Sequence, residues 1–137
     1  MTWYSYALSA TIFLASGFLL VKKASTTGVP VNTLTLYIWV FAALMLFAYM
    51  GYAKESLFLS PIQLGVLLLA GVSFLFGALL VNHAVYAAPN PGYATAVASA
   101  QVLIVVIASV FLFGSPFSLI KAFGALLTVA GVILLGV

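Results

Sequence analysis

Long apolar segments with few or no charges dominate this sequence and limit what it can fold into. Five of them approach or exceed the length at which an α-helix, rising about 1.5 Å per residue, crosses about 30 Å of hydrocarbon. Only 4% of the residues are charged, whereas 66% are hydrophobic. So few charges cannot solvate the surface of a small soluble particle. Lipid must therefore be the outer solvent, and we predict an all-α membrane protein.

Turn signals separate the apolar segments. Gly28-Val29-Pro30 and Pro89-Asn90-Pro91 interrupt the chain with turn formers, and Lys54-Glu55 ends the second segment. Ser60-Pro61 and Ser115-Pro116 each place a capping serine before a proline at the first helical position, where a missing N–H has no cost. We predict one transmembrane domain over residues 1–137, a bundle of five helices at roughly 3–21, 31–52, 61–86, 93–113 and 117–137.

The first apolar segment differs from a secretory signal. No basic region precedes it, and it is too long for a signal core. We therefore expect it to stay in the mature protein.

The four lysines are divided evenly between the two sides of the predicted bundle. Lys54 and Lys121 fall on one side, and Lys22 and Lys23 fall on the other. The positive-inside rule compares Lys and Arg on the two sides, so an even division fixes no orientation. Two hypotheses stay open. Copies insert both ways and pair as antiparallel dimers, or folding or a partner sets one orientation.

Several functional classes lack the residues they require. The chain has no cysteine and a single histidine, and its one acidic residue is Glu55. A Ser/His/Asp triad has no Asp, and a metal site has no ligands beyond His83. The scattered lysines form no basic stripe for nucleic acid. We predict neither an enzyme nor a protein that needs a cofactor, a metal or a nucleic-acid partner.

Gln101 is the polar residue near the middle of the fourth predicted helix. At about 100° per residue it shares a face with Ala94, Ala98 and Ala108. Polar groups in hydrocarbon are costly and tend to face protein or a cavity. Gln101 is therefore either a substrate-facing hydrogen-bonding group in the space that the alanines leave, or a partner in an interhelical hydrogen bond.

Two further groups of polar residues lie inside the predicted helices. Ser5, Ser9 and Ser16 fall within about 40° of one another on the first helix, where they line a polar path or bond back to their own helix. Asn82 and His83 lie near the end of the third helix. Because a histidine ordinarily titrates near neutral pH, His83 is a candidate proton carrier; the alternative is an interfacial contact with headgroups or water.

Aromatic residues supply the remaining candidate contacts to a solute. Tyr37 and Trp39 lie deeper in the second helix than an interfacial belt requires. Their rings suit stacking on a cationic or aromatic solute, or packing against lipid or a neighbouring helix. The candidate substrate-binding residues are Gln101, Ser9, Ser16, Trp39, Tyr37, Asn82 and His83.

Small residues predict where helices approach closely. Gly92, Ala96 and Ala100 follow one another at four-residue spacing, the small-xxx-small pattern of close helix packing. Gly124 and Gly131 are small residues of the fifth helix that also suggest tight helix contact. We predict that these five residues form helix contacts or part of a dimer interface.

Short apolar motifs occur in a characteristic order along the chain. Gly17 precedes the Val21-Lys22-Lys23 end of the first helix, residues 86–88 precede 92–96, and Phe111-Leu112-Phe113-Gly114 precedes the run 124–134. In this order they resemble the EamA-type repeat of the drug/metabolite transporter superfamily. Members commonly carry ten helices as two inverted halves. The resemblance therefore implies one half, completed by dimerisation with a second copy or a homologous half.

The same resemblance implies a transporter that moves a small organic solute by alternating access across a dimer interface. The related small multidrug resistance proteins carry a membrane-embedded glutamate in the first helix. This chain has no acid there, and Glu55 falls in a predicted loop, so carboxylate-gated antiport is not expected. Two alternatives stay open: a non-transporting structural or accessory subunit, and half of a lipid-linked substrate flippase.

The expected surroundings follow from the same reasoning. We expect the lipid bilayer and a small organic solute as partners, and a multi-pass location in a cell membrane, the prokaryotic inner or plasma membrane.

Overall fold

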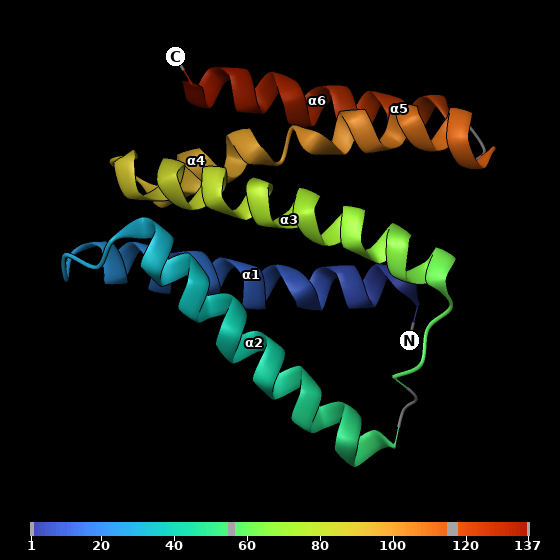
Figure 1. The fold of residues 1–137 in the computed structure, drawn as a ribbon. Coiled ribbons are helices and arrows are strands. Elements are labelled where there is room, and N and C mark those ends of the chain that lie inside the picture. Colours follow the sequence, from blue (N-terminus) through green and yellow to red (C-terminus); the bar gives the residue numbers. More distant parts are fainter. Residues whose placement is uncertain (1, 55–56, 115–117, 137) are drawn as a thin grey trace. The chain divides into compact units, whose positions relative to one another are not determined.

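Six helices make up most of the described part of the chain, in which no residue lies in a strand. The computed structural model describes residues 2–54, 57–114 and 118–136. The helices, drawn in Figure 1, are α1 (Trp3–Ser25), α2 (Val31–Ala53), α3 (Pro61–Ala87), α4 (Pro91–Ala98), α5 (Gln101–Phe113) and α6 (Leu119–Gly136).

Among the described residues, four segments are long and apolar enough to cross a membrane. They are α1, α2, α3 and the continuous stretch Pro91–Phe113, which contains both α4 and α5. A shorter apolar helix covers Ala122–Leu135 within α6. This arrangement confirms the predicted all-α membrane fold and fits the prediction of five helical segments.

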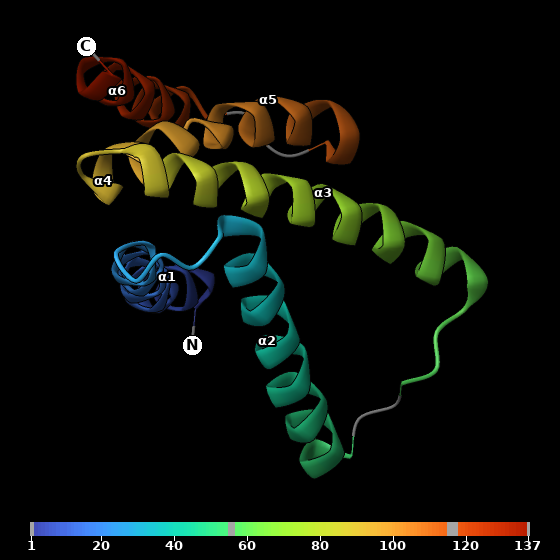
Figure 2. The same cartoon turned by 60° about the vertical axis from the view of Figure 1, so that its left-hand side comes forward.

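The chain divides into two compact units, Met1–Tyr86 and Ala87–Val137. In the first unit, α1 and α2 contact each other. The buried residues of this unit are Val21, Leu34, Thr35, Asn82 and Val85. All of them lie at one end, where α1 finishes, α2 begins and α3 finishes. Away from this end, α2 diverges from α3 in both Figure 1 and Figure 2.

In the second unit, α6 packs against both α4 and α5. Its buried residues are Ala125 and Val132, which are seven positions apart and therefore share one face of the helix. Small and β-branched side chains on that face let the helices approach closely, the usual basis of helix association in lipid.

The segment predicted as a single helix over residues 93–113 contains a break at Ser99 and Ala100. The N–H of Ala100 bonds to the carbonyl of Val97 at 3.1 Å, and the N–H of Val102 bonds to the carbonyl of Ser99 at 3.0 Å. These three-residue spacings tighten the turn, as in a 3₁₀-helix. The Ser99 hydroxyl also donates to the Ala96 carbonyl at 2.6 Å, a back-bond that bends helices.

Helix α1 continues one turn beyond its predicted end, through Lys22 and Lys23 to Ser25. Two physical features explain the extension. Cations in the last turn are favourable for the helix dipole. The hydroxyls of Ser25 and Thr26 donate to the carbonyls of Lys22 and Lys23 at 2.7 and 2.8 Å.

The start of α3 confirms the predicted Ser60 cap. The Gln63 N–H donates to the Ser60 hydroxyl at 3.3 Å, and the Ser60 N–H donates to the Gln63 side-chain oxygen at 2.9 Å. This reciprocal pair is a capping box, and the sequence analysis had identified only its serine. The predicted Ser115-Pro116 cap and Glu55 lie outside the described residues.

Candidate functional site

Polar side chains from three helices meet at the buried end of the first unit. We call this cluster the polar junction. It combines the end of α1, the connection from α1 to α2, the first turns of α2 and the last turns of α3. Its members are Lys22, Val29, Asn32, Thr35, Asn82, His83, Val85 and Tyr86.

The centre of the polar junction is a hydrogen bond between α3 and α2. The side-chain amide of Asn82 donates to the Thr35 hydroxyl at 2.9 Å, and that hydroxyl donates to the Val31 carbonyl at 2.9 Å. Thr35 is 1% exposed and Asn82 is 7% exposed. A buried amide that lost such a partner would carry a desolvation cost, so the bond fixes the position of the two helices.

Lys22 binds the carboxyl end of α3. Its ammonium donates to the carbonyl oxygens of Val85 at 3.2 Å and of Tyr86 at 3.0 Å. The last four carbonyls of a helix have no partner within the helix, and they carry the negative end of its dipole. The half-buried ammonium of Lys22 is therefore bound by carbonyls that the helix itself leaves without a partner.

Two further contacts close the polar junction. His83 and Asn32 lie 3.3 Å apart, between the ring Nε2 and the side-chain oxygen. The Tyr86 hydroxyl donates to the Val29 carbonyl at 3.2 Å. His83 and Asn32 are exposed, so this edge of the polar junction is open to its surroundings.

The structure brings together two of the candidate substrate-binding residues, Asn82 and His83, in adjacent contacts to α2. It leaves the serines of α1 apart from the polar junction. The Ser16 hydroxyl donates to the Phe13 carbonyl at 2.9 Å and the Ser5 hydroxyl to the Thr2 carbonyl at 2.8 Å. Those bonds match the back-bonding interpretation of the serine stripe. Ser9 is exposed on the same helix.

The aromatic candidates of α2 are also largely uncovered. Tyr37 is 55% exposed and Trp39 is 44% exposed. The Tyr37 ring lies 5.8 Å from the Phe41 ring, tilted by 35°. Both rings of this contact belong to α2. The exposed side chains of Tyr37 and Trp39 are therefore accessible to lipid or to a partner.

In the second unit, Gln101 is the first residue of α5 and is exposed. The break at Ser99 and Ala100 therefore separates it from the helix turn that carries Ala94 and Ala98. Gly92 belongs to the start of α4, where its N–H donates to the Asn90 side chain at 2.8 Å. Ala96 and Ala100 are half-buried, whereas Gly124 and Gly131 are exposed on α6.

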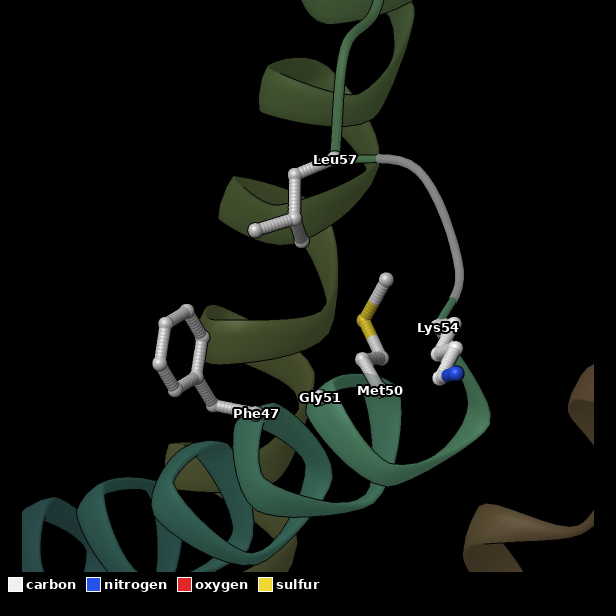
Figure 3. A pocket seen from close by; sticks show the side chains of 5 residues that line it. All are labelled: Phe47, Met50, Gly51, Lys54 and Leu57. Atoms are coloured by element: carbon white, nitrogen blue, oxygen red, sulfur yellow. The ribbon is translucent and has the colours of Figure 1, made fainter.

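A hollow of about 220 Å³ lies at the far end of α2, away from the polar junction. Figure 3 shows the side chains around it: Phe47, Met50, Gly51, Lys54 and Leu57. Lys54 ends α2 with a left-handed backbone at φ 54°. The hollow is about half open and mainly apolar, and Lys54 is the one charged residue among those that line it, so the lining offers no set of convergent polar groups to orient a ligand.

The described residues contain no group of three or more His, Cys, Asp or Glu that could hold a metal ion. Within the same part of the chain, every buried side-chain nitrogen or oxygen has a hydrogen-bond partner. The polar junction is thus a network in which each buried side-chain polar atom has a hydrogen-bond partner.

The site includes three residues that were not predicted to belong to it: Lys22, Asn32 and Thr35. A signal for Thr35 was present, because it is a hydroxyl one turn inside an otherwise apolar helix. Lys22 was predicted to mark the end of the first helix and to count toward orientation, and its position within the last turn of α1 depends on the extra turn that the structure reveals.

Comparison with known proteins decides the family. The model of the EamA-like transporter family matches residues 1–137. The chain belongs to the EamA-like transporter family. This finding confirms the resemblance and assigns the chain to a family of membrane transporters, not of enzymes. No curated protein and no solved structure matches it.

Within this EamA-like chain, the four membrane-length segments make it a multi-pass membrane protein. The polar junction ties three of its helices together at one end of the first unit.

Proposed function

We propose that this chain is one half of a transporter that moves a small organic solute by alternating access at an interface between two copies. The observation that carries the proposal is the family match over residues 1–137. Inverted repeats of such transporters normally build the substrate path where the two halves meet, near the membrane midplane. A single five-segment half supplies one wall of such a path.

The low burial of the helices supports an interface between copies. Within one 18-residue apolar stretch of each membrane segment, 6% of the residues of α1 and 11% of those of α2 are buried. In the corresponding stretches of α3 and of Pro91–Phe113, no residue is buried. Large faces of all these helices are therefore free to contact lipid or a second chain. Gly92, Ala96, Ala100, Gly124 and Gly131 are the proposed contact positions, because small residues let backbones approach closely.

The proposed solute-facing residues are those with polar or aromatic groups on exposed faces. Gln101 can donate and accept hydrogen bonds, and His83 can exchange a proton. Tyr37 and Trp39 offer ring faces to a cationic or aromatic solute. Ser9 and Ser16 add hydroxyls on α1. An amino acid or an amphipathic amine fits this combination. Asn82 contributes indirectly, through its bond to Thr35.

Uptake into liposomes tests the proposal. Purified protein is reconstituted and offered radiolabelled amino acids and amphipathic amines, with empty liposomes as the background. We expect saturable uptake that falls in the Gln101→Leu variant. Ser109→Ala is the matched control, because its hydroxyl bonds to the Val106 carbonyl of its own helix. Absence of uptake for every solute would favour an accessory subunit, and movement of a labelled lipid-linked substrate would favour a flippase.

Orientation tests the antiparallel form of the dimer. The chain has no cysteine, so a Thr27→Cys reporter in the α1–α2 connection gives a single labelling site. We expect a membrane-impermeant maleimide to label about half of the chains in intact cells, since the even lysine division gives no orientation bias. Permeabilisation should then complete the labelling. Labelling of either all or none of the chains in intact cells would instead mean one orientation, and would direct the search to a differently oriented partner chain or an accessory role.

A further inference from the structure

Among the described residues of the first unit, the side-chain hydrogen bonds that are seen to cross between helices lie at one end. The bonds of Lys22, Asn82, His83 and Tyr86 all reach another helix or the α1–α2 connection. Farther along the same helices, the hydroxyls of Thr11 and Ser16 on α1 and of Ser73 on α3 donate to carbonyls of their own helix. Directional links between helices are thus present at the polar junction, and the described hydroxyls away from it provide none.

Burial follows the same distribution. Each buried residue of the first unit lies at the polar junction or beside it: Val21, Leu34, Thr35, Asn82 and Val85. At the other end of α2, the exposed fraction rises to 61% at Tyr49 and 88% at Tyr52. Figure 2 shows this part of α2 far from α3. Regions with few buried contacts open at lower free energy than the regions that hold them.

We propose that the polar junction is a fixed pivot, about which the far end of α2 swings relative to α3. Asn82 and Thr35 form its centre, because their bond is buried and joins the two helices directly. Lys22 holds α1 against the end of α3, so α1 and α3 stay together while α2 moves. Asn82 and Thr35 are accordingly positioning residues that act through the placement of α2.

This inference rests on the proposed transport function, because movement about the pivot serves alternating access. Alternating access requires one element to move against another around a fixed point. A helix held at one end and uncovered at the other has that freedom. Its motion can be measured without any solute, so the test of the pivot is independent of the test of transport.

Pairs of spin labels measure the motion in lipid nanodiscs. One pair, Thr33→Cys with Leu80→Cys, joins α2 and α3 close to the polar junction. The second pair, Tyr49→Cys with Leu68→Cys, joins the same helices far from it. All four positions are exposed. Thr33→Cys with Tyr49→Cys lies within α2 alone and calibrates the width that flexible labels contribute. Dipolar electron-spin spectroscopy gives a distance distribution for each pair.

We expect the near pair to match the width of the calibration pair, and the far pair to be about twice as broad. Equal widths for the near and far pairs would overturn the pivot. This comparison uses the unaltered polar junction and therefore does not depend on the folding of a junction variant.

The double substitution Asn82→Leu with Thr35→Val then removes the central bond while keeping side chains of similar size. We expect it to broaden the near pair toward the width of the far pair. Ser73→Ala is the matched control, because it removes a hydroxyl of α3 that bonds within its own helix. An unchanged near pair in the double variant would overturn the assignment of Asn82 and Thr35. If the motion is present but liposomes take up no solute, the proposed transport fails and the pivot stands.

Discussion

Polar side chains connect different helices in residues Met1–Tyr86, whereas in Ala87–Val137 the hydroxyls of Thr95, Ser109 and Thr128 bond within their own helices. In the first unit, Asn82 reaches Thr35 on another helix and Lys22 reaches the end of α3. In the second, the hydroxyls of Ser109 and Thr128 donate to carbonyls three or four residues earlier. The two units therefore differ in what fixes the position of one helix against the next.

Lipid tails are as apolar as the side chains they touch, so burial alone provides little drive for helix association in a membrane. Packing and interhelical hydrogen bonds must supply it. The first unit relies on hydrogen bonds, and its apolar faces are largely uncovered. The second relies on α6, whose small buried residues pack against α4 and α5. Removal of a polar group should therefore lower the stability of the first unit. A change in the volume of a packed side chain should lower the stability of the second.

The largest expected effect is at Lys22. Its replacement by methionine keeps the length of the side chain but removes the ammonium that binds the Val85 and Tyr86 carbonyls. Hydrogen bonds to charged groups contribute about 1.5–3 kcal/mol. Because Lys22 is only half-buried, we expect the free energy of unfolding to fall by about 2 kcal/mol, measured by SDS titration in mixed micelles.

Lys23→Met is the matched control for that measurement. It removes the same charge from the same end of α1, so it alters the lysine balance of the chain equally, but Lys23 is exposed. We expect a loss within about 0.5 kcal/mol. Equal losses in the two variants would mean that Lys22 stabilises the protein through its charge alone. The hydrogen bonds of Lys22 would then no longer distinguish the first unit from the second.

The next effect belongs to the second unit. Ala125 is 8% exposed on the face of α6 that packs in this unit. Ala125→Leu adds three carbons where the helices are close, and overpacking of this kind costs about 1–3 kcal/mol. The same SDS titration measures the loss. Ala130→Leu, at an exposed position of the same helix, should leave stability nearly unchanged. Unchanged stability of the Ala125→Leu variant would show that close packing does not hold this unit together.

A smaller effect is expected for the central bond of the polar junction. Asn82→Leu, Thr35→Val and the double variant form a double-mutant cycle. Interhelical hydrogen bonds in membranes average about 0.6 kcal/mol and reach about 1.7 kcal/mol. Both residues are almost fully buried, so we expect a coupling of about 1 kcal/mol in the free energy of unfolding. A coupling near zero would mean that the bond forms but contributes nothing to the free energy of unfolding.

The fold was largely predictable because length and apolar composition determine membrane helices. The predicted starts of α1, α2 and α3 coincide with the structure, since turn formers such as Pro30 and Pro61 mark them directly. The break at Ser99 and Ala100 was not predictable in the same way. It depends on a serine back-bond within an apolar run, and serine in such a run is equally compatible with a straight helix.

The site was harder to predict than the fold. Asn82 and His83 stand out as polar groups in an apolar segment, and both belong to the polar junction. Their partners Thr35 and Asn32 lie about fifty positions earlier in the chain. No periodicity along one helix reveals which residue of another helix faces it. A single sequence thus shows which polar groups need partners, while the tertiary arrangement decides which partners they have.

The smallest expected effect is at Ser109, in the second unit. Ser109→Ala removes a hydroxyl that donates to the Val106 carbonyl at 2.9 Å within α5. That carbonyl can still accept the regular helical bond from the N–H four residues later, so no buried group is left without a partner. Alanine also has the higher helix propensity. We therefore expect the free energy of unfolding to change by less than about 0.5 kcal/mol in the SDS titration. A loss as large as the Asn82–Thr35 coupling would show that a hydroxyl bonded within its own helix also fixes neighbouring helices, and the two units would then be held by the same means.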